Sequence, residues 1–276
     1  MKKYFGSLVL GSMVFATVAL ATSSGVLLPV SDGSFSQWTP STGSTHYNLV
    51  DESACNGTTD YVSTNTVGNR DSYGINLSSI PNGAVITEVK IKPCASKNKT
   101  GGSSSVLKVF YAHNGTSSSD AGNYNLTGTT PVDLAVTTFG GLSLTKSSST
   151  AMQVGAVLSS GTRGARLSRI EATLTYEMPE TVPNSPSNLF ASVSTSGTST
   201  LISLVSLTWT DNSNNETGFK VNRSLNGTDF TLIGTTASNT TNFDDVVSTG
   251  TYYYRVEAYN SVGDSAPSNT ETVIAP

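Results

Sequence analysis

The sequence predicts an all-β protein made of two consecutive antiparallel β-sandwiches. Only 12% of the residues are charged, and the Ala, Glu, Lys and Leu that fill helical bundles are scarce. Thr, Val, Tyr and Ser lie between Gly and Asn turns, which favours strands. Apolar and polar residues also alternate with a period of two in many short runs, as expected for strands with one buried face.

The composition argues against two other classes of protein. A hydrophobic content of 36%, with 11 Tyr and 9 Phe, is enough to build a core, so intrinsic disorder is not expected. The net charge is -4 and Lys and Arg total only 15, which provides no basic surface for nucleic acid. We therefore expect a folded protein with no nucleic-acid partner.

Residues 1–21 are expected to be a cleaved export signal. Two lysines precede an apolar, uncharged run from Tyr4 to Leu20, and Ala19 and Ala21 place small residues before a cut at Thr22. The alternative is an uncleaved membrane anchor, for which the run is short. No other run is long enough to span a membrane, so we expect a secreted or cell-surface protein without a membrane span after cleavage.

The chain contains two cysteines, Cys55 and Cys94, both in its N-terminal half. In an exported chain an even pair most simply forms a disulfide, and the alternative is two unpaired thiols. The bond would close a loop of about 40 residues and stabilise the fold by roughly 4 kcal/mol through the entropy of the unfolded chain.

A proline-rich segment divides the chain into two predicted domains. Residues 177–188, EMPETVPNSPSN, contain three prolines and few residues suited to burial, which is typical of a linker. We place one domain at residues 22–178, a linker at 179–187 and a second domain at 188–276. The second domain is acidic, with 3 basic and 8 acidic residues, whereas the first is nearly neutral.

Period-two alternation in the second domain predicts antiparallel strands packed on one side, and Asn226-Gly227 predicts a hairpin turn. The pattern gives this inward-facing set: Val205, Leu207, Trp209, Phe219, Val221, Tyr252, Tyr254, Val256 and Ala258. We expect Trp209, Tyr252 and Tyr254 to be its structural core residues.

The second domain resembles a fibronectin type III domain of the bacterial kind in two segments, LTWTDNSNNETGFKVNRS and GTYYYRVEAYNSVGDSAPSN. The resemblance covers about residues 183–276. It implies a seven-stranded, immunoglobulin-like sandwich with Trp209 in the core on the second strand. It also implies that Tyr252 is the tyrosine of the corner that precedes the sixth strand. The sequence contains no RGD, so no adhesion motif carries over.

The first domain shows longer alternating runs. Thr87, Val89 and Ile91 are expected to face one way in ITEVKIK, and the apolar face of RIEATLTYE begins at Ile170 and ends at Tyr176. The segment VLKVFYAH is apolar on both faces, which predicts a central strand. We expect eight or nine strands in a two-sheet sandwich.

A succession of four segments in this domain is similar to a jelly-roll-like module that occurs in phage structural proteins and exported microbial surface proteins. The segments are WTPSTGSTHYNLVDE, TDYVSTNTVGNRDSYGI, IPNGAVITEVKIK and RIEATLTYE. The resemblance covers roughly residues 25–178 and implies a fold and a setting, but no activity. Cys55 and Cys94 are not part of that pattern.

Residues suited to catalysis or metal binding are sparse, so we expect no enzyme activity, no cofactor and no metal site. His46 is expected on a surface strand and His113 at a packed strand end. Counting leaves a Ser-His-Asp site open, but no GxSxG elbow occurs. Zinc would need three or four closely spaced Cys or His residues. Asp51 and Glu52 are adjacent on a predicted strand, so they point to opposite faces and do not form the carboxylate pair of a glycosidase without a bulge.

Three other polar features are interpreted as structural. Residues 211–216 are rich in oxygen atoms but lack EF-hand spacing, which indicates a loop between strands rather than a calcium site. Asp244-Asp245 is expected in a solvated turn. Nine Asn-X-Ser/Thr sequons occur, including Asn56, Asn114 and Asn226, against roughly six expected from composition, so glycosylation is not predicted.

Aromatic side chains are the remaining candidates for ligand binding, because flat rings with a polar edge stack on sugars. The candidate ligand face comprises Trp38, Tyr47, Tyr61 and Tyr73, with Tyr111 and Tyr124 as further candidates. We expect a non-enzymatic, exported binding or adhesion protein whose partners are glycans, cell-surface polymers or other surface proteins. One alternative is a structural subunit or spacer of a surface layer, appendage or phage-derived particle. Another is an accessory module of a secreted polysaccharide-degrading system.

Overall fold

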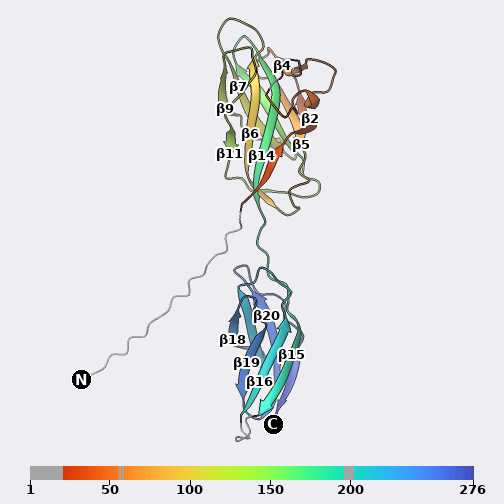
Figure 1. Cartoon of the computed structure of the whole chain (residues 1–276), viewed down its shortest axis with the longest axis vertical. Helices are drawn as coiled ribbons and strands as arrows, with labels where there is room; N and C mark the ends of the chain where they lie inside the picture. The colour runs from red at the N-terminus through yellow and green to blue at the C-terminus, as the bar shows by residue number, and fades with distance from the viewer. Residues whose placement is uncertain (1–20, 56, 58, 196–201) are drawn as a thin grey trace, which may run out of the picture. The chain divides into compact units, whose positions relative to one another are not determined.

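The computed structural model describes residues 21–55, 57, 59–195 and 202–276, which form two compact units at 21–179 and 180–276 (Figure 1). Apart from Ala21, the expected export signal lies outside the described residues. Both units are built almost entirely of strands, with one short 3-10 helix, η1 (Tyr47–Leu49), in the described part of the chain. No helix within these described ranges has the length and hydrophobicity needed to cross a membrane.

The first unit contains two antiparallel sheets. The eight-stranded sheet consists of β1 (Thr22–Leu27), β3 (Thr39–Pro40), β4 (Val62–Thr64), β6 (Val85–Lys97), β10 (Val132–Asp133), β11 (Thr137–Phe139), β12 (Leu144–Thr145) and β14 (Ala165–Glu177). The six-stranded sheet consists of β2 (Pro29–Ser36), β5 (Arg70–Ile75), β7 (Ser105–His113), β8 (Thr116–Ser117), β9 (Ala121–Leu126) and β13 (Met152–Ser160). The number of strands in the first unit exceeds the eight or nine expected, because several of them are only two or three residues long.

The strand pairs of the first unit are nested around the connection between β7 and β9. β7 pairs with β9, β6 with β10, β11 and β12, β5 with β13, and β4 with β14. A long hairpin rolled up into two sheets produces this pattern, which is that of a jelly roll. The prediction of a jelly-roll-like sandwich is confirmed by this pairing.

A β-bulge in β6 corrects one expected side-chain orientation. Glu88 pairs with Thr175 and Ile86 pairs with Tyr176, so Thr87 is an extra residue in its strand. The extra residue resets the alternation, which buries both Ile86 and Val89 although they are three positions apart. Thr87 is half-buried rather than inward-facing.

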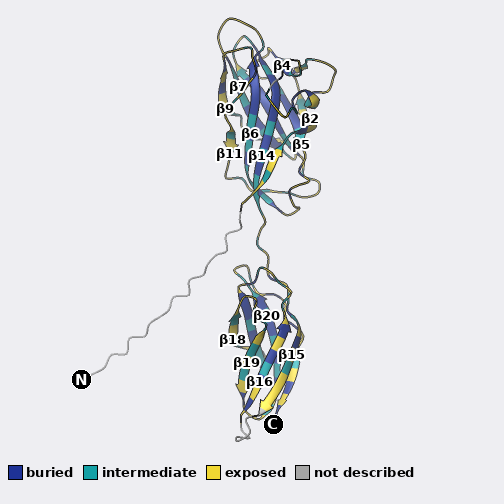
Figure 2. Cartoon of the chain, viewed as in Figure 1, coloured by how far each residue is buried: buried dark blue, intermediate teal, exposed yellow. Residues whose placement is uncertain are grey.

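The core of the first unit lies between its two sheets, and Figure 2 shows β6 and β14 as largely buried strands. Ile170, Ala172 and Leu174 of β14 face this core. β7 carries buried residues on both of its faces, as expected for a central strand. Its Leu107 and Val109 enter the core. Phe110, on the opposite face, is covered by the ring of Phe35, and the centroids of the two rings are 5.6 Å apart.

The second unit is a seven-stranded sandwich. One sheet has the order β15 (Ser187–Thr195), β16 (Ser203–Thr210), β19 (Asn242–Val247). The other has the order β18 (Thr231–Ala237), β17 (Gly218–Ser224), β20 (Gly250–Tyr259), β21 (Glu271–Ala275). Trp209 and Tyr254 are buried between the sheets, and the Tyr252 hydroxyl donates a hydrogen bond to the Ser248 carbonyl at 3.1 Å. That bond is the geometry of a tyrosine corner, and the unit is a fibronectin type III-like sandwich.

The proline-rich segment is not a free linker from Glu180 onward. The Thr181 carbonyl accepts hydrogen bonds from the side-chain amides of Asn215 and Asn260, both at 2.8 Å. Pro183 and Pro186 are buried. Asparagine side chains therefore fasten this segment to loops of the second unit, an interaction that its composition alone does not indicate.

Asp244 and Asp245 lie in β19 rather than in a solvated turn. Asp245 Oδ2 accepts hydrogen bonds from the Tyr254 hydroxyl and from Arg223 Nη1, both at 2.8 Å. Burial raises the pKa of Tyr254, and the hydrogen bond and negative charge of Asp245 raise that pKa further. The tyrosine is therefore held in its neutral form.

We expect the second unit to lose stability as the pH rises above about 10, where an unperturbed tyrosine ionises. Folded Tyr254 keeps its proton there while the unfolded chain releases it, so deprotonation favours the unfolded state. Urea denaturation of residues 180–276 between about pH 8 and 11 measures this loss. The free energy of unfolding of Tyr254→Phe should decrease less over this pH range. Tyr253→Phe, which changes a residue on the other face of β20, should show the same decrease as wild type. Equal slopes in wild type and Tyr254→Phe would contradict this assignment.

Candidate functional site

Two residues of the expected ligand face lie inside the first unit. Trp38 is 3% exposed and its indole nitrogen donates to the Asn69 carbonyl at 3.0 Å. Tyr73 is fully buried and its hydroxyl donates to Asp71 Oδ2 at 2.9 Å. Closure of the two sheets covers both rings, so the expectation that they contact a ligand is wrong.

The other two residues of that face are half-buried and already packed. Tyr47 lies in η1 and packs against the hydrophobic core. The Arg166 guanidinium lies over the ring of Tyr61, 4.5 Å from its centroid. The four rings therefore do not form an open stacking surface.

A pocket of about 290 Å³ lies beside the turn between β7 and β8. We call it the β7–β8 pocket. It is lined by Tyr111, His113, Asn114, Thr116, Ser117, Ser118 and Leu144. The pocket thus combines an aromatic ring, an imidazole, an amide and several hydroxyl groups, and none of the described residues that line it is a carboxylate, a lysine or an arginine.

Local sequence explains how the pocket is built. Asn114 and Gly115 have φ angles of 48° and 84°, and His113 pairs with Thr116 across them. A two-residue Asn-Gly loop with positive φ at both positions is the favoured turn of a tight hairpin. Asn114 Oδ1 also accepts a hydrogen bond from the Ala151 amide at 2.9 Å, which fixes the turn to the start of β13. This Asn-Gly pair was a sequence signal for the site.

Two groups in the β7–β8 pocket are suited to a ligand. The Tyr111 ring packs in part against the hydrophobic core and makes an edge-on contact with Phe139, with the ring centroids 5.2 Å apart, and it also lines the pocket. His113 Nε2 is buried and has no hydrogen-bond partner among the described residues. Because a buried polar atom without a partner is costly, this nitrogen is a candidate contact for a ligand hydroxyl.

His46 is buried, not on a surface strand. It lies directly before η1, with Nδ1 2.7 Å from Asp71 Oδ2 and Nε2 3.4 Å from Ser36 Oγ. Ser36 and Asp71 are 10 and 25 positions from His46 in the sequence, so no local motif predicted that the three side chains meet. We call Ser36, His46 and Asp71 the Ser-His-Asp cluster.

Burial raises the pKa of the Asp71 carboxyl, while the hydrogen bonds from His46 and Tyr73 and the nearby backbone N–H of Trp38 act against that rise. The other Asp71 oxygen, Oδ1, is buried without a hydrogen-bond partner in the described part of the chain. Burial, together with the charge and the hydrogen bond of Asp71, raises the pKa of the Tyr73 hydroxyl well above its usual value. Tyr73 therefore donates its proton to Asp71 rather than ionising.

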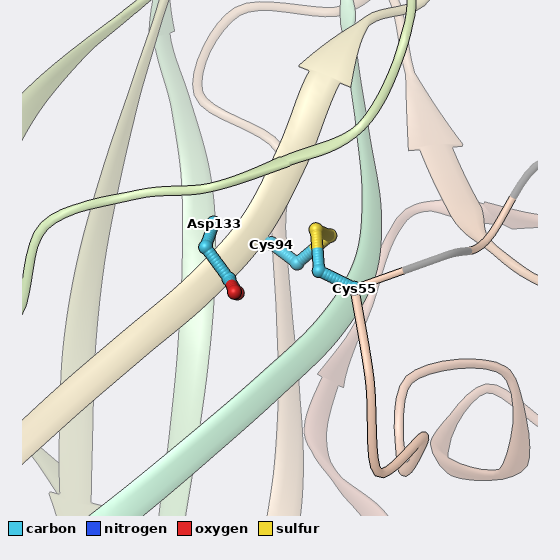
Figure 3. A group of neighbouring side chains, drawn as sticks. All are labelled: Cys55, Cys94 and Asp133. Carbon is cyan, nitrogen blue, oxygen red and sulfur yellow. A yellow bond between two sulfur atoms is a disulfide. The ribbon is translucent and has the colours of Figure 1, made fainter.

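One trio of Cys, His, Asp or Glu side chains in the described ranges lies close enough to hold a metal ion: Cys55, Cys94 and Asp133 (Figure 3). Cys55 and Cys94 form a disulfide, which confirms the predicted bond, so their sulfurs are not free thiolates. Asp133 is engaged by Arg169 and by Lys92. This trio is therefore a structural cluster.

The remaining polar candidates are structural or unconnected to a site. Asp51 and Glu52 follow η1 in an irregular segment, not on a strand. In the 211–216 loop, Asp211 Oδ1 accepts from the Ser213 amide at 2.9 Å, and the buried Glu216 accepts from the Asn239 amide at 3.2 Å. Of the sequons, Asn114 and Asn226 lie in hydrogen-bonded turns, and Asn56 lies outside the described residues.

No protein-family model matches the chain, and no curated protein matches it. Solved structures similar to it include a two-domain fibronectin type III segment of chicken tenascin, with 13% identity, 78% of this chain and 97% of that chain covered, and a TM-score of 0.28. Another is the N-terminal CBM22-1-CBM22-2 tandem domain from Paenibacillus barcinonensis Xyn10C, with 11% identity, 94% and 99% covered, and a TM-score of 0.36. These scores are low, so the description of each sandwich rests on its own strand pairing.

Proposed function

We propose that the protein is an exported binding module whose first unit binds neutral glycans in the β7–β8 pocket. The observation that carries this proposal is the unpartnered, buried His113 Nε2 beside the Tyr111 ring. An aromatic ring offers an apolar face to a sugar ring, and imidazole, amide and hydroxyl groups exchange hydrogen bonds with its hydroxyls. The lining carries no carboxylate, lysine or arginine, which suits an uncharged ligand.

The pocket volume and chemistry limit the mode of binding. A volume of about 290 Å³ is at the small end for ligand pockets, which suits one or two sugar units of a longer chain. A shallow, wet site gains little net free energy, so we expect a dissociation constant of about 0.1 to 1 mM. Because no carboxylate lines the pocket, it lacks the paired acids that hydrolyse glycosidic bonds.

The disulfide supports an extracytoplasmic location. Cys55 and Cys94 are bonded, and disulfides persist mainly in oxidising compartments. We propose that an export signal at residues 1–21 takes the chain there.

A calorimetric titration of the chain from Thr22 to Pro276 with a panel of neutral polysaccharides tests the function. Tyr111→Ala should weaken binding by about tenfold or more, since it removes the stacking surface. Tyr61→Ala is the matched control, because its ring is half-buried outside the pocket, and it should bind as wild type does. EDTA should change nothing. Equal binding by wild type and Tyr111→Ala, or no heat with any glycan, would contradict the proposal.

A further inference from the structure

The Ser-His-Asp cluster has the order of contacts that activates a serine nucleophile. Ser36 Oγ contacts His46 Nε2 at 3.4 Å, and His46 Nδ1 contacts Asp71 Oδ2 at 2.7 Å. A hydroxyl, an imidazole that can take its proton, and a carboxylate that orients the imidazole are the three parts of such a site. The serine contact is somewhat long, as is common in sites without substrate.

Three separate elements hold these side chains together. Ser36 ends β2, and the register of the sheet pairs it with Asp71 of β5. The backbone amides of His46 and Tyr47 both donate to Asp32 Oδ1, at 2.8 and 2.7 Å. Asp32 thereby fixes the backbone that presents the imidazole, so the arrangement does not depend on side-chain rotamers alone.

The hydrogen bonds select the tautomer of His46 that a general base needs. An ionised Asp71 can only accept, and its Oδ2 also accepts from the Tyr73 hydroxyl. Nδ1 of His46 therefore carries the ring proton. The lone pair of Nε2 then faces the Ser36 hydroxyl, which is the donor in that contact.

Exposure increases from the carboxylate to the serine. Asp71 is fully buried, His46 is 6% exposed, and Ser36 is exposed at the end of β2, an outer strand of its sheet. The imidazole and the carboxylate are thus shielded from solvent, whereas Ser36 is an exposed residue. An exposed hydroxyl at a sheet edge can reach a group that projects from a polymer without requiring a deep cleft.

We propose that Ser36 is a nucleophile that removes small acyl groups, such as acetyl, from the hydroxyls of a polymer. Ser36 Oγ attacks the ester carbonyl carbon as its proton moves to His46 Nε2. The carbon–oxygen bond of the ester breaks, and the departing alcohol takes that proton. Water then attacks the acyl-serine by the same proton transfers, so ester and water give carboxylic acid and alcohol. Asp71 acts as a positioning residue.

This activity goes beyond the proposed glycan binding, and it uses none of the residues that line the β7–β8 pocket. The two proposals therefore fail separately: Tyr111→Ala should leave the chemistry at Ser36 unchanged, and Ser36→Ala should leave glycan affinity unchanged.

A fluorophosphonate probe tests the nucleophile directly, because it forms a stable bond to an activated serine with loss of fluoride. Intact mass and peptide mapping of the full chain should show one adduct, on Ser36. A positioned general base raises a reaction rate by about 10² to 10⁴-fold, so Ser36 should react with the probe at least about a hundredfold faster than other exposed serines. Ser36→Ala should lose the adduct. Ser34→Ala, which changes an exposed serine two positions earlier on β2, should keep it.

Two further variants distinguish a reactive site from a structural cluster. His46→Gln should slow labelling by about a hundredfold while circular dichroism shows a folded protein. Asp71→Asn should change the tautomer of His46, read from histidine ¹⁵N shifts, and slow labelling. Wild type should hydrolyse 4-nitrophenyl acetate faster than Ser36→Ala. No adduct, adducts spread over several serines, labelling that folded His46→Gln leaves unchanged, or equal hydrolysis by wild type and Ser36→Ala would each overturn the proposal.

Discussion

Replacing Trp209 by alanine is expected to lower the free energy of unfolding of the second unit by about 3 to 5 kcal/mol. The indole is 6% exposed and meets the Phe219 ring at a centroid distance of 5.5 Å. Truncation removes the largest side chain from a small core and leaves a cavity that rigid strands on both sides cannot fill. The indole nitrogen is buried without a partner in the described part of the chain. Removing this unpaired group is favourable, but it offsets only a small part of the stability that the truncation loses.

Urea denaturation of residues 180–276, followed by far-ultraviolet circular dichroism, measures this effect. Leu225→Ala is the control, because Leu225 is 72% exposed and its truncation should change stability by less than about 0.5 kcal/mol. The free energy of unfolding of Trp209→Phe should lie between those of Trp209→Ala and Leu225→Ala. This milder change still gives a measurement if Trp209→Ala does not fold. A Trp209→Ala midpoint equal to that of Leu225→Ala would show that the indole is not in the core.

Removing the disulfide by changing both Cys55 and Cys94 to serine should cost the first unit about 4 kcal/mol. The bond joins residues 39 positions apart, so it restricts a long stretch of the unfolded chain. It also fastens the irregular segment before β4 to Cys94 of the central strand β6. Both effects favour the folded state of the wild-type protein.

Thermal unfolding of the whole chain with and without reductant reports this loss. The transition of the first unit should move to lower temperature in the double variant and in reduced wild type alike. The transition of the second unit, which contains no cysteine, serves as the internal control. A first transition that is unchanged in both samples would contradict the stabilising role of the bond.

Strand faces were predictable from the sequence where one face meets the core and the other meets water. The inward faces of β16 and β20 follow period two without interruption, as do Phe219 and Val221 of β17, and the fibronectin-like pattern and this alternation lead to the same core. The same rule failed at Thr87, because a bulge adds one residue that no composition marks.

The sites were less predictable because they depend on contacts between distant parts of the chain. Trp38 and Tyr73 look like ligand-binding aromatics, but the pairing of β2 with β5 and sheet closure bury them. His46 looks like a surface residue until Asp71 is placed beside it. Only the β7–β8 pocket had a local signal, the Asn114-Gly115 turn.

Glycan binding in the β7–β8 pocket is tested most directly by mapping chemical-shift changes on the ¹⁵N-labelled chain from Thr22 to Pro276. The titrant is the glycan that gives the largest calorimetric heat. Binding in this pocket should shift a cluster of amides at residues 111–118 and around Leu144, and all of these shifts should saturate with the same dissociation constant. Shifts centred on Tyr47 and Tyr61 or on the second unit, or an unchanged spectrum at millimolar ligand, would contradict the assignment of the β7–β8 pocket as the binding site.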